Sequence, residues 1–560
     1  MAREIHSLPD ASSLPFSPVP PPFDRGEPAG GTPGSAGSFI TPEGEERPSN
    51  EWIGSPNGAP AARIGQEPGR ASPRGPSRPG RGPMPRSEET ITMARTRVLV
   101  EVTADDHREG FAAFAEAASS PDSARRQLDR ALGAVAGLGV EPSESAGPIP
   151  LFGGPPGAAD PAVPRSLRAF AGPETAADLA ATSLVVPAEV EESRLEELRG
   201  RDGVLGVWPN SPQHLLRGAE PDLLRGTEGR IPAPARAPSA VDCRPFREAV
   251  EIEAIREALG VGALWEAGFR GEDVIVGIID EGIDGDTYPV AGGFAPEGGS
   301  RQPGTAPVTS HGSMCAADVL VAAPDARLYD YPFLGVPDSG GALAMFQAVL
   351  DRRRRDGTPH LTTNSYGFVG VPDRRTNPRH EIHDIDHPLH RKVREVVASG
   401  VACFFAAGNC GEQCASGACH PSGTGPGRSI HASNSLAEVI TVAAVNSRCE
   451  RVGYSSQGPG MFEREKPDLA AFTHFFANFG PDRPGGTDEA PYDSGTSAAA
   501  PLAAGAAALL LCAAPDLSPD DLRRILLSGA KPAGEAEWDP GYGRGVLDVA
   551  ASYAAMTEED

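Results

Sequence analysis

The sequence predicts an α/β domain with a mostly parallel sheet, and three observations support this class. Apolar runs rich in β-branched residues recur as candidate buried strands, of which residues 274–280 (VIVGIID) and 401–407 (VACFFAA) are the clearest. Helical segments such as 341–355 stand between such runs, and strands that alternate with helices pair in parallel through right-handed crossovers. The length of 560 residues and a hydrophobic fraction of 39% allow a full core and two or more domains.

The chain begins with a segment that we expect to be disordered. Residues 1–92 are dense in Pro, Gly, Ser and Arg and contain few aromatic residues. Such a composition buries too little apolar surface to offset the entropy of an ordered chain. Met93 stands directly before the first convincing strand, so it is an alternative start of translation.

Residues 93–216 are predicted to form a small α+β module, followed by a linker at 217–242. The interval 139–162 is rich in Gly and Pro and is expected to be a loop-like insertion. The linker is polar and then rich in Pro and Ala, as expected for an exposed segment open to cleavage. The expected elements of the module are a strand at 98–102, a helix at 123–138, a strand at 184–187, a helix at 189–199 and a strand at 204–208.

The α/β domain is expected over residues 243–556. The run 498–514 is long and apolar enough to span a membrane, but it contains Pro501 and Gly505 and is mostly alanine, which favours a helix buried in protein. In 517–529, Ser518 is a predicted N-cap and Gly529 a stop signal. Further expected elements are strands at 327–331 and 360–365 and a helical region at 382–399.

Three polar residues lie at predicted strand ends and helix starts, where catalytic residues are common. Asp280 ends a predicted buried strand, and open α/β sheets bind ligands at the carboxyl ends of their strands. His311 opens a predicted helix, with Gly312 leaving room for a peptide backbone. Ser497 lies in a tight turn (DSGTSAAAP) before the helix at 498–514, where free backbone N–H groups can stabilise an oxyanion. A nucleophile needs a base and the base needs an orienting group, and these residues could supply all three.

In these motifs and in the order Asp, His, Ser, the C-terminal half of the chain resembles the subtilisin-like serine proteases, or subtilases. The blocks IIDEGID, SHGSMCA and SGTSAAAP carry the resemblance. It implies a three-layer subtilisin-like domain and a serine endopeptidase that hydrolyses peptide bonds through an acyl-enzyme. Asp280, His311 and Ser497 would be its triad, and Asn409, in FFAAGN, its oxyanion residue.

The resemblance also implies a groove that binds the substrate as an added strand. One wall would be formed by Ser365, Tyr366 and Gly367, with the aromatic ring of Tyr366 on that wall. The opposite wall of the first specificity pocket would be formed by Ala406, Ala407 and Gly408.

The last part of the N-terminal module resembles the end of subtilase propeptides, which fold over the active site. The matching stretch is a helix followed by GRDGVLGVWPN. It implies a self-inhibited precursor in which the module is an intramolecular inhibitor and polypeptides are the substrate. A generic regulatory domain is the alternative for the module. For the whole chain, the alternatives are a catalytically silent peptide-binding pseudoprotease and a metal- or redox-gated regulator.

Two residues depart from the family pattern. Glu281 follows Asp280 where a small hydroxyl residue is usual, and its carboxylate could raise the proton affinity of His311. Alternatively, its side chain points to solvent, because neighbouring residues of a strand diverge. Ala498 follows Ser497 where methionine is usual, which removes a thioether that peroxide would oxidise.

The eight cysteines leave several states open. Cys410, Cys414, Cys419 and His420 follow the oxyanion asparagine, and they allow a loop-closing disulfide, reduced thiols or a zinc site. The usual two-residue cysteine spacing is absent, which disfavours zinc. The apolar settings of Cys315, Cys403 and Cys512 predict buried free thiols.

The formal charge of −26 disfavours binding to nucleic acid and to anionic membranes. The only compact basic run, 352–355, is expected to be the C-terminal turn of the helix at 341–355, where cations complement the dipole. No secretory signal is recognised at the start of the chain, which favours a cytoplasmic location, with unconventional export as the alternative. We expect a monomer that needs no cofactor, and calcium is implied only by the family resemblance.

Overall fold

The structure is a computed structural model in which the described residues lie within one compact unit, Glu89–Asp560. The residues described are 94–103, 129, 133, 135–143, 147–152, 183–216, 241–243, 249–296, 301–333, 337–480, 482–486 and 492–558. The predicted disordered segment 1–92, Met93 and linker residues 217–240 lie outside these ranges, as does most of the helix predicted at 123–138.

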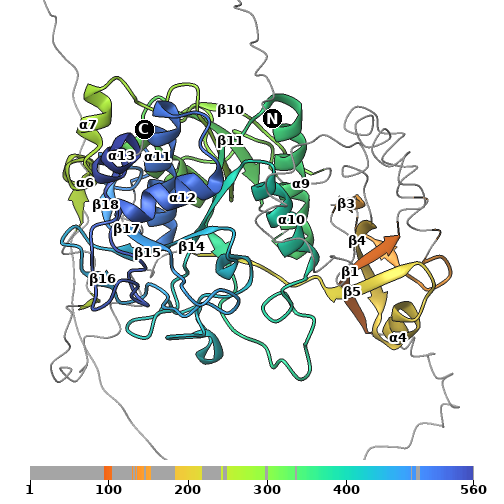
Figure 1. Cartoon of the computed structure of the whole chain (residues 1–560). Coiled ribbons are helices and arrows are strands. Elements are labelled where there is room, and N and C mark those ends of the chain that lie inside the picture. The colour runs from red at the N-terminus through yellow and green to blue at the C-terminus, as the bar shows by residue number, and fades with distance from the viewer. Residues whose placement is uncertain are drawn as a thin grey trace, which may run out of the picture. The chain divides into compact units, whose positions relative to one another are not determined.

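The described part of residues 93–216 is an α+β module built on an antiparallel sheet (Figure 1). The strands lie in the order β2-β4-β1-β5, and β3 also pairs with β4. Its elements are β1 (Arg95–Thr103), β2 (Glu141–Pro142), β3 (Ile149–Leu151), β4 (Ser183–Glu191), the 3-10 turn η1 (Glu192–Arg194), α4 (Leu195–Arg199) and β5 (Val204–Pro209).

Two expectations for this module are wrong in detail. The helix predicted from residue 189 does not begin until Leu195, because β4 continues to Glu191 with Val190 paired to Thr96 of β1 and buried. The interval 139–162 was expected to be loop-like, but its described residues contain strands β2 and β3, both paired with β4. In both places tertiary pairing overrides a weak local preference.

The second part of the chain contains a nine-stranded sheet in the order β10-β11-β9-β12-β14-β15-β16-β7, with β17 also paired to β15. All pairs in this sheet are parallel except β15 with β16. The chain enters this sheet at Val241, two residues before the expected domain start. Its strands are β7 (Val241–Asp242), β9 (Ile275–Asp280), β10 (Val290–Gly293), β11 (Arg327–Pro332), β12 (Leu361–Asn364), β14 (Ala402–Ala406), β15 (Ile440–Val445), β16 (Arg451–Val452) and β17 (Leu469–Phe472).

Helices cover both faces of this sheet. The remaining elements are α6 (Ile252–Leu259), α7 (Val261–Glu266), α8 (His311–Ala322), α9 (Ser339–Asp356), α10 (Pro388–Ala398), α11 (Thr496–Ala513), α12 (Pro519–Ser528) and α13 (Val549–Glu558), 3-10 turns η3 (Pro421–Gly423) and η4 (Ala432–Ser435), and short strands β6 (His214–Leu215), β8 (Val250–Glu251), β13 (Tyr366–Gly367) and β18 (Phe475–Phe476). The helix expected from residue 382 begins at Pro388, with His387 as its N-cap.

Alternation along the buried strands assigns side chains to the two faces. Ile278 and Phe404 belong to a core cluster with α8 and α11, whereas their neighbours Ile279 and Phe405 belong to a second cluster with α9 and α10. Successive side chains of a strand point to opposite faces, so strands buried on both sides need apolar residues at every position. The predicted three-layer α/β fold is confirmed (Figure 1).

Helix α11 is buried at the centre of this domain. Among the described residues, it is the helix long and apolar enough to cross a membrane by length and composition, and 89% of that window is buried inside the structure. A Cβ on Gly505 would lie 2.2 Å from the carbonyl oxygen of Val319, so this glycine lets α11 approach α8 closely. The small residues of this run therefore serve helix packing.

The second face of the module's sheet packs against α9 and α10. Val98 and Val100 lie in the module's own core, whereas Leu99 between them belongs to the cluster that contains Leu343 and Val393. A buried ion pair supports this contact, since the guanidinium of Arg391 donates to both carboxylate oxygens of Glu101 at 2.8 Å. The module is thus docked on the α/β domain through apolar and charged contacts.

Candidate active site

Asp280 and His311 lie at adjacent ends of β9 and α8. The Asp280 Oδ1 atom lies 2.8 Å from His311 Nδ1, and the carboxylate is also fixed by the backbone N–H of Glu281, which donates to Oδ1 at 2.6 Å. Both side chains are buried. An Nδ1–H group that donates to Asp280 leaves Nε2 with the lone pair, which is the form of histidine that accepts a proton.

The start of α8 is held against the loop after β9. Ser310 is the N-cap, and its Oγ accepts from the backbone N–H of Ser313 at 3.1 Å. A Cβ on Gly312 would lie 2.4 Å from the carbonyl oxygen of Gly282, which explains why glycine follows His311. The expected close backbone approach at this residue therefore occurs, and the partner is the Asp280 loop.

The side chain of Glu281 turns towards the start of α8 rather than to solvent. Its Oε2 accepts from the backbone N–H of His311 at 3.0 Å, and its side chain is only 14% exposed. The solvent-pointing expectation is wrong, because the free N–H groups of the first turn of α8 attract the carboxylate. Glu281 is thus a cap that fixes the backbone of His311.

Ser497 lies in the first turn of α11 and is fully buried. Its Oγ donates a hydrogen bond to the backbone carbonyl of Leu216, the last described residue before the linker. His311 Nε2 is buried and has no hydrogen-bond partner among the described residues. The serine is therefore turned towards a peptide carbonyl in the resting structure.

Asn409 is directed at the same carbonyl. Its Nδ2 donates to the Leu216 carbonyl oxygen at 2.8 Å. Its Oδ1 accepts from the backbone N–H and from the hydroxyl of Thr496, each at 3.0 Å. Because Thr496 donates to the amide oxygen of Asn409, the amide N–H group must face Leu216. This is the orientation in which the side chain can stabilise an oxyanion.

The groove predicted beside the serine holds the chain's own residues. Strand β6 pairs antiparallel with β13, with Leu215 opposite Tyr366 and His214 opposite Gly367. The backbone N–H of Leu216 donates to the Ser365 carbonyl at 2.9 Å. The resemblance to propeptides implied that the module covers the active site, but the sequence did not indicate which residues enter the groove, because two paired residues in a polar stretch carry no strand signal of their own.

The predicted place of the Tyr366 ring on the groove wall stays a prediction. With β6 in the groove the ring is buried and stacks on Phe333 with centroids 4.8 Å apart, and the Tyr366 backbone pairs with Leu215. On the opposite side, Ala406 shares a buried apolar cluster with Leu216. Ala407 and Gly408 continue from Ala406 to Asn409, and the Gly408 N–H donates to the Thr496 hydroxyl at 3.1 Å.

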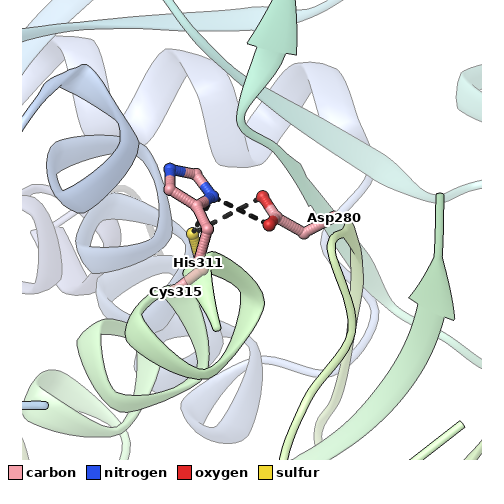
Figure 2. Close-up of side chains that lie close together, drawn as sticks. All are labelled: Asp280, His311 and Cys315. Carbon is pink, nitrogen blue, oxygen red and sulfur yellow. Dashed lines mark hydrogen bonds and ion pairs between the residues drawn. The ribbon is translucent and has the colours of Figure 1, made fainter. Parts of the chain in front are cut away.

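A thiol that sequence reasoning treated only as buried lies beside the acid and the base. Cys315 Sγ lies 3.7 Å from Asp280 Oδ2 and 3.9 Å from His311 Nδ1 (Figure 2). Cys315 follows His311 by four residues, a spacing that places both on one face of a helix and could have revealed the contact. Burial and the nearby Asp280 raise the pKa of the thiol well above its usual range, so the sulfur remains protonated and is a poor nucleophile.

The cysteines after Asn409 form disulfides. Cys410 is bonded to Cys419, as one of the three alternatives expected, and Cys414 is bonded to Cys243 at a separation of 171 residues. These bonds consume the thiolates that a zinc ion would need, and His420 Nδ1 contacts the Ser422 hydroxyl at 2.8 Å instead. The ring closed by Cys410 and Cys419 directly follows Asn409 and helps to fix it.

We expect thiol titration of the denatured, unreduced protein to find four free cysteines, and eight after reduction. Cys315, Cys403, Cys449 and Cys512 are free, and the other four are bonded. Replacing Cys243 and Cys414 together by serine removes the link with the longer loop and should cost several kcal/mol, about 5 in the chain-entropy description. Eight thiols in the unreduced protein would contradict both bonds.

Comparisons with known proteins identify relatives of a large part of this chain. The model of the subtilase family matches residues 271–545. Subtilisin DY of Bacillus licheniformis is 29% identical over 300 residues, which cover 51% of this chain and 92% of that protein. Serine protease AprX of Bacillus subtilis (strain 168) is 28% identical over 276 residues, which cover 43% of this chain and 56% of AprX.

Among solved structures, fervidolysin from Fervidobacterium pennivorans, described as a keratinolytic enzyme related to subtilisin, matches with a TM-score of 0.48 and 17% identity. The match covers 84% of this chain and 62% of that one.

Proposed function

Because residues 271–545 belong to the subtilase family, we propose that this chain is a serine endopeptidase with Asp280, His311 and Ser497 as its triad. The observation that carries the proposal is the Leu216 carbonyl, which is bound by both Ser497 Oγ and Asn409 Nδ2. A nucleophile and an oxyanion donor meeting at one peptide carbonyl is the arrangement that acyl transfer requires.

In the proposed reaction, Ser497 Oγ attacks the carbonyl carbon while its proton passes to His311 Nε2. Asp280 holds the imidazole in the productive tautomer and stabilises the cation. Asn409 Nδ2–H and the backbone N–H of Ser497 hold the oxyanion. The C–N bond then breaks as His311 returns the proton to the leaving amine, and water hydrolyses the acyl-enzyme by the reverse steps. The proposed reaction needs no cofactor.

We further propose that the N-terminal module is an intramolecular inhibitor and that the first bond cleaved is Leu216–Arg217. Leu216 supplies the carbonyl bound at Ser497, and β6 fills the groove beside β13. The module's docking on α9 and α10 would keep this segment in place after cleavage. The two disulfides favour an oxidising compartment over the cytoplasm, and we propose such a location for the mature protein.

The test is labelling of the recombinant full chain with a fluorophosphonate probe, followed by identification of the labelled peptide. We expect label on Ser497 in the wild type after incubation that allows self-processing, and no label in Ser497→Ala. Absence of label in the wild type, even after limited proteolysis removes the module, would favour the catalytically silent peptide-binding protein instead.

Asn409→Ala should lower the turnover number by about 10²–10³, with a smaller change in KM, because its amide stabilises charge that develops only in the transition state. Turnover measured per active site, with sites counted by probe labelling, separates this effect from misfolding. An unchanged turnover number would remove Asn409 from the oxyanion site.

A further inference from the structure

The chain segment before Leu216 lies in the groove as a substrate would. Beyond the pairing of β6 with β13, the backbone N–H of Gln213 donates to the Pro337 carbonyl at 2.7 Å. With Leu216 counted as the first residue before the cleaved bond, Gln213 is the fourth. Its backbone is therefore held in a defined register relative to Ser497.

The side chain of Gln213 reaches a buried carboxylate. Its Nε2 donates to Glu381 Oε2 at 2.8 Å, and the two residues are 5% and 1% exposed. Ser339 Oγ donates to the same oxygen at 2.7 Å. The second oxygen, Oε1, lies 3.4 Å from Ser433 Oγ and 3.7 Å from His390 Nε2.

Glu381 is an anion in this setting. Burial alone would raise the pKa of its carboxyl group, but the contact with His390 and the nearby His387 outweigh burial and lower the pKa to about 2. A buried anion becomes less stable whenever one of its hydrogen-bond donors is removed without replacement. The site therefore favours a substrate residue whose side chain donates a hydrogen bond to Glu381 Oε2.

We propose that Glu381 is a specificity-determining residue that selects polypeptides with glutamine at the fourth position before the cleaved bond. This inference rests on the proposed function. A leucine at that position would leave Glu381 Oε2 with one donor fewer in a site closed to water, and a glutamate would place a second negative charge against it. The side-chain amide of glutamine satisfies the carboxylate and adds no charge.

Glu381 also has structural contacts, because Ser339 begins α9 and Ser433 lies in η4. Replacing Glu381 could thus loosen both elements, and a loss of activity in the variant alone would not establish a role in specificity. The decisive comparison is therefore kcat/KM for different substrates, since replacing a purely structural residue would change kcat/KM for all substrates alike.

The experiment uses internally quenched peptides with the sequence of residues 211–218, SPQHLLRG, in which the glutamine is kept or replaced by leucine or glutamate. For the self-processed wild type, kcat/KM should fall by about 10–100-fold from glutamine to leucine, and further to glutamate. As the matched control, alanine in place of the histidine should change kcat/KM by less than about threefold, because His214 is exposed.

The Glu381→Gln variant should narrow the difference between the glutamine and leucine peptides and accept the glutamate peptide better than the wild type does, because an amide can donate to a carboxylate. Equal kcat/KM of the wild type for the glutamine and leucine peptides would overturn the inference and leave proteolysis intact. If no peptide is cleaved and no probe labels Ser497, the proposed function itself fails. Should Glu381→Gln not fold, the wild-type series decides alone.

Discussion

Replacing Ser497 by alanine should abolish self-cleavage after Leu216 and lower the turnover number on any peptide by about 10⁶-fold. No other described side chain is placed to act in its stead. Ser497 Oγ is the hydroxyl bonded to the Leu216 carbonyl, and the neighbouring Cys315 remains a protonated thiol. Cys315 also contacts His311 through Nδ1, on the Asp280 side of the ring.

Intact mass after expression measures this prediction directly. The wild type should yield two fragments that divide between Leu216 and Arg217, whereas Ser497→Ala should retain the mass of the uncleaved chain. Ser494→Ala, three residues earlier in the same turn, is the matched control and should be processed like the wild type. Identical fragments from Ser497→Ala would show that another protease makes the cut. The proposal that Ser497 cleaves the Leu216–Arg217 bond would then fail.

Much of the α/β domain could be predicted because its signals are local. The run at 274–280 became β9, the apolar stretch after Ser497 became α11, and Ser518 caps α12, where its Oγ accepts from Asp521 N at 3.1 Å. In such segments the hydrophobic pattern, the N-cap residue and the residue that ends the element all favour one structure. The positions of Asp280 at the end of β9 and of His311 at the start of α8 could be predicted for the same reason.

The features that were not foreseen depend on contacts distant in sequence. Nothing around Cys243 indicates that it pairs with Cys414, and nothing in the polar stretch before the linker indicates that Leu216 reaches Ser497. The direction of the Glu281 side chain was misjudged because it depends on the neighbouring helix α8. The contact of Gln213 with Glu381 joins residues of two separate parts of the chain, which periodicity cannot relate.

Asp280→Asn should lower the turnover number by about 10⁴-fold while leaving the fold intact, because it removes the negative charge that stabilises the imidazolium form of His311. In the structure the Asp280 carboxylate faces His311 Nδ1 at 2.8 Å, which keeps the proton on Nδ1 and the lone pair on Nε2. The same Oδ1 accepts the backbone N–H of Glu281, so an asparagine would keep its oxygen at this point. Its neutral amide would still orient the ring but would no longer stabilise the cation that His311 becomes when it takes the proton of Ser497.

Turnover per labelled active site and the melting temperature, measured together, separate this effect from misfolding. The conservative control is Asp284→Asn in the same loop, whose carboxylate bonds only to nearby groups, the Asp286 N–H and the Thr287 hydroxyl, and it should stay within about threefold of the wild type. If Asp280→Asn keeps most of its turnover, His311 must be oriented by other contacts. His311 also contacts Glu281 through its backbone N–H and Cys315 through Nδ1, so Glu281→Gln and Cys315→Ala would then be the variants to examine.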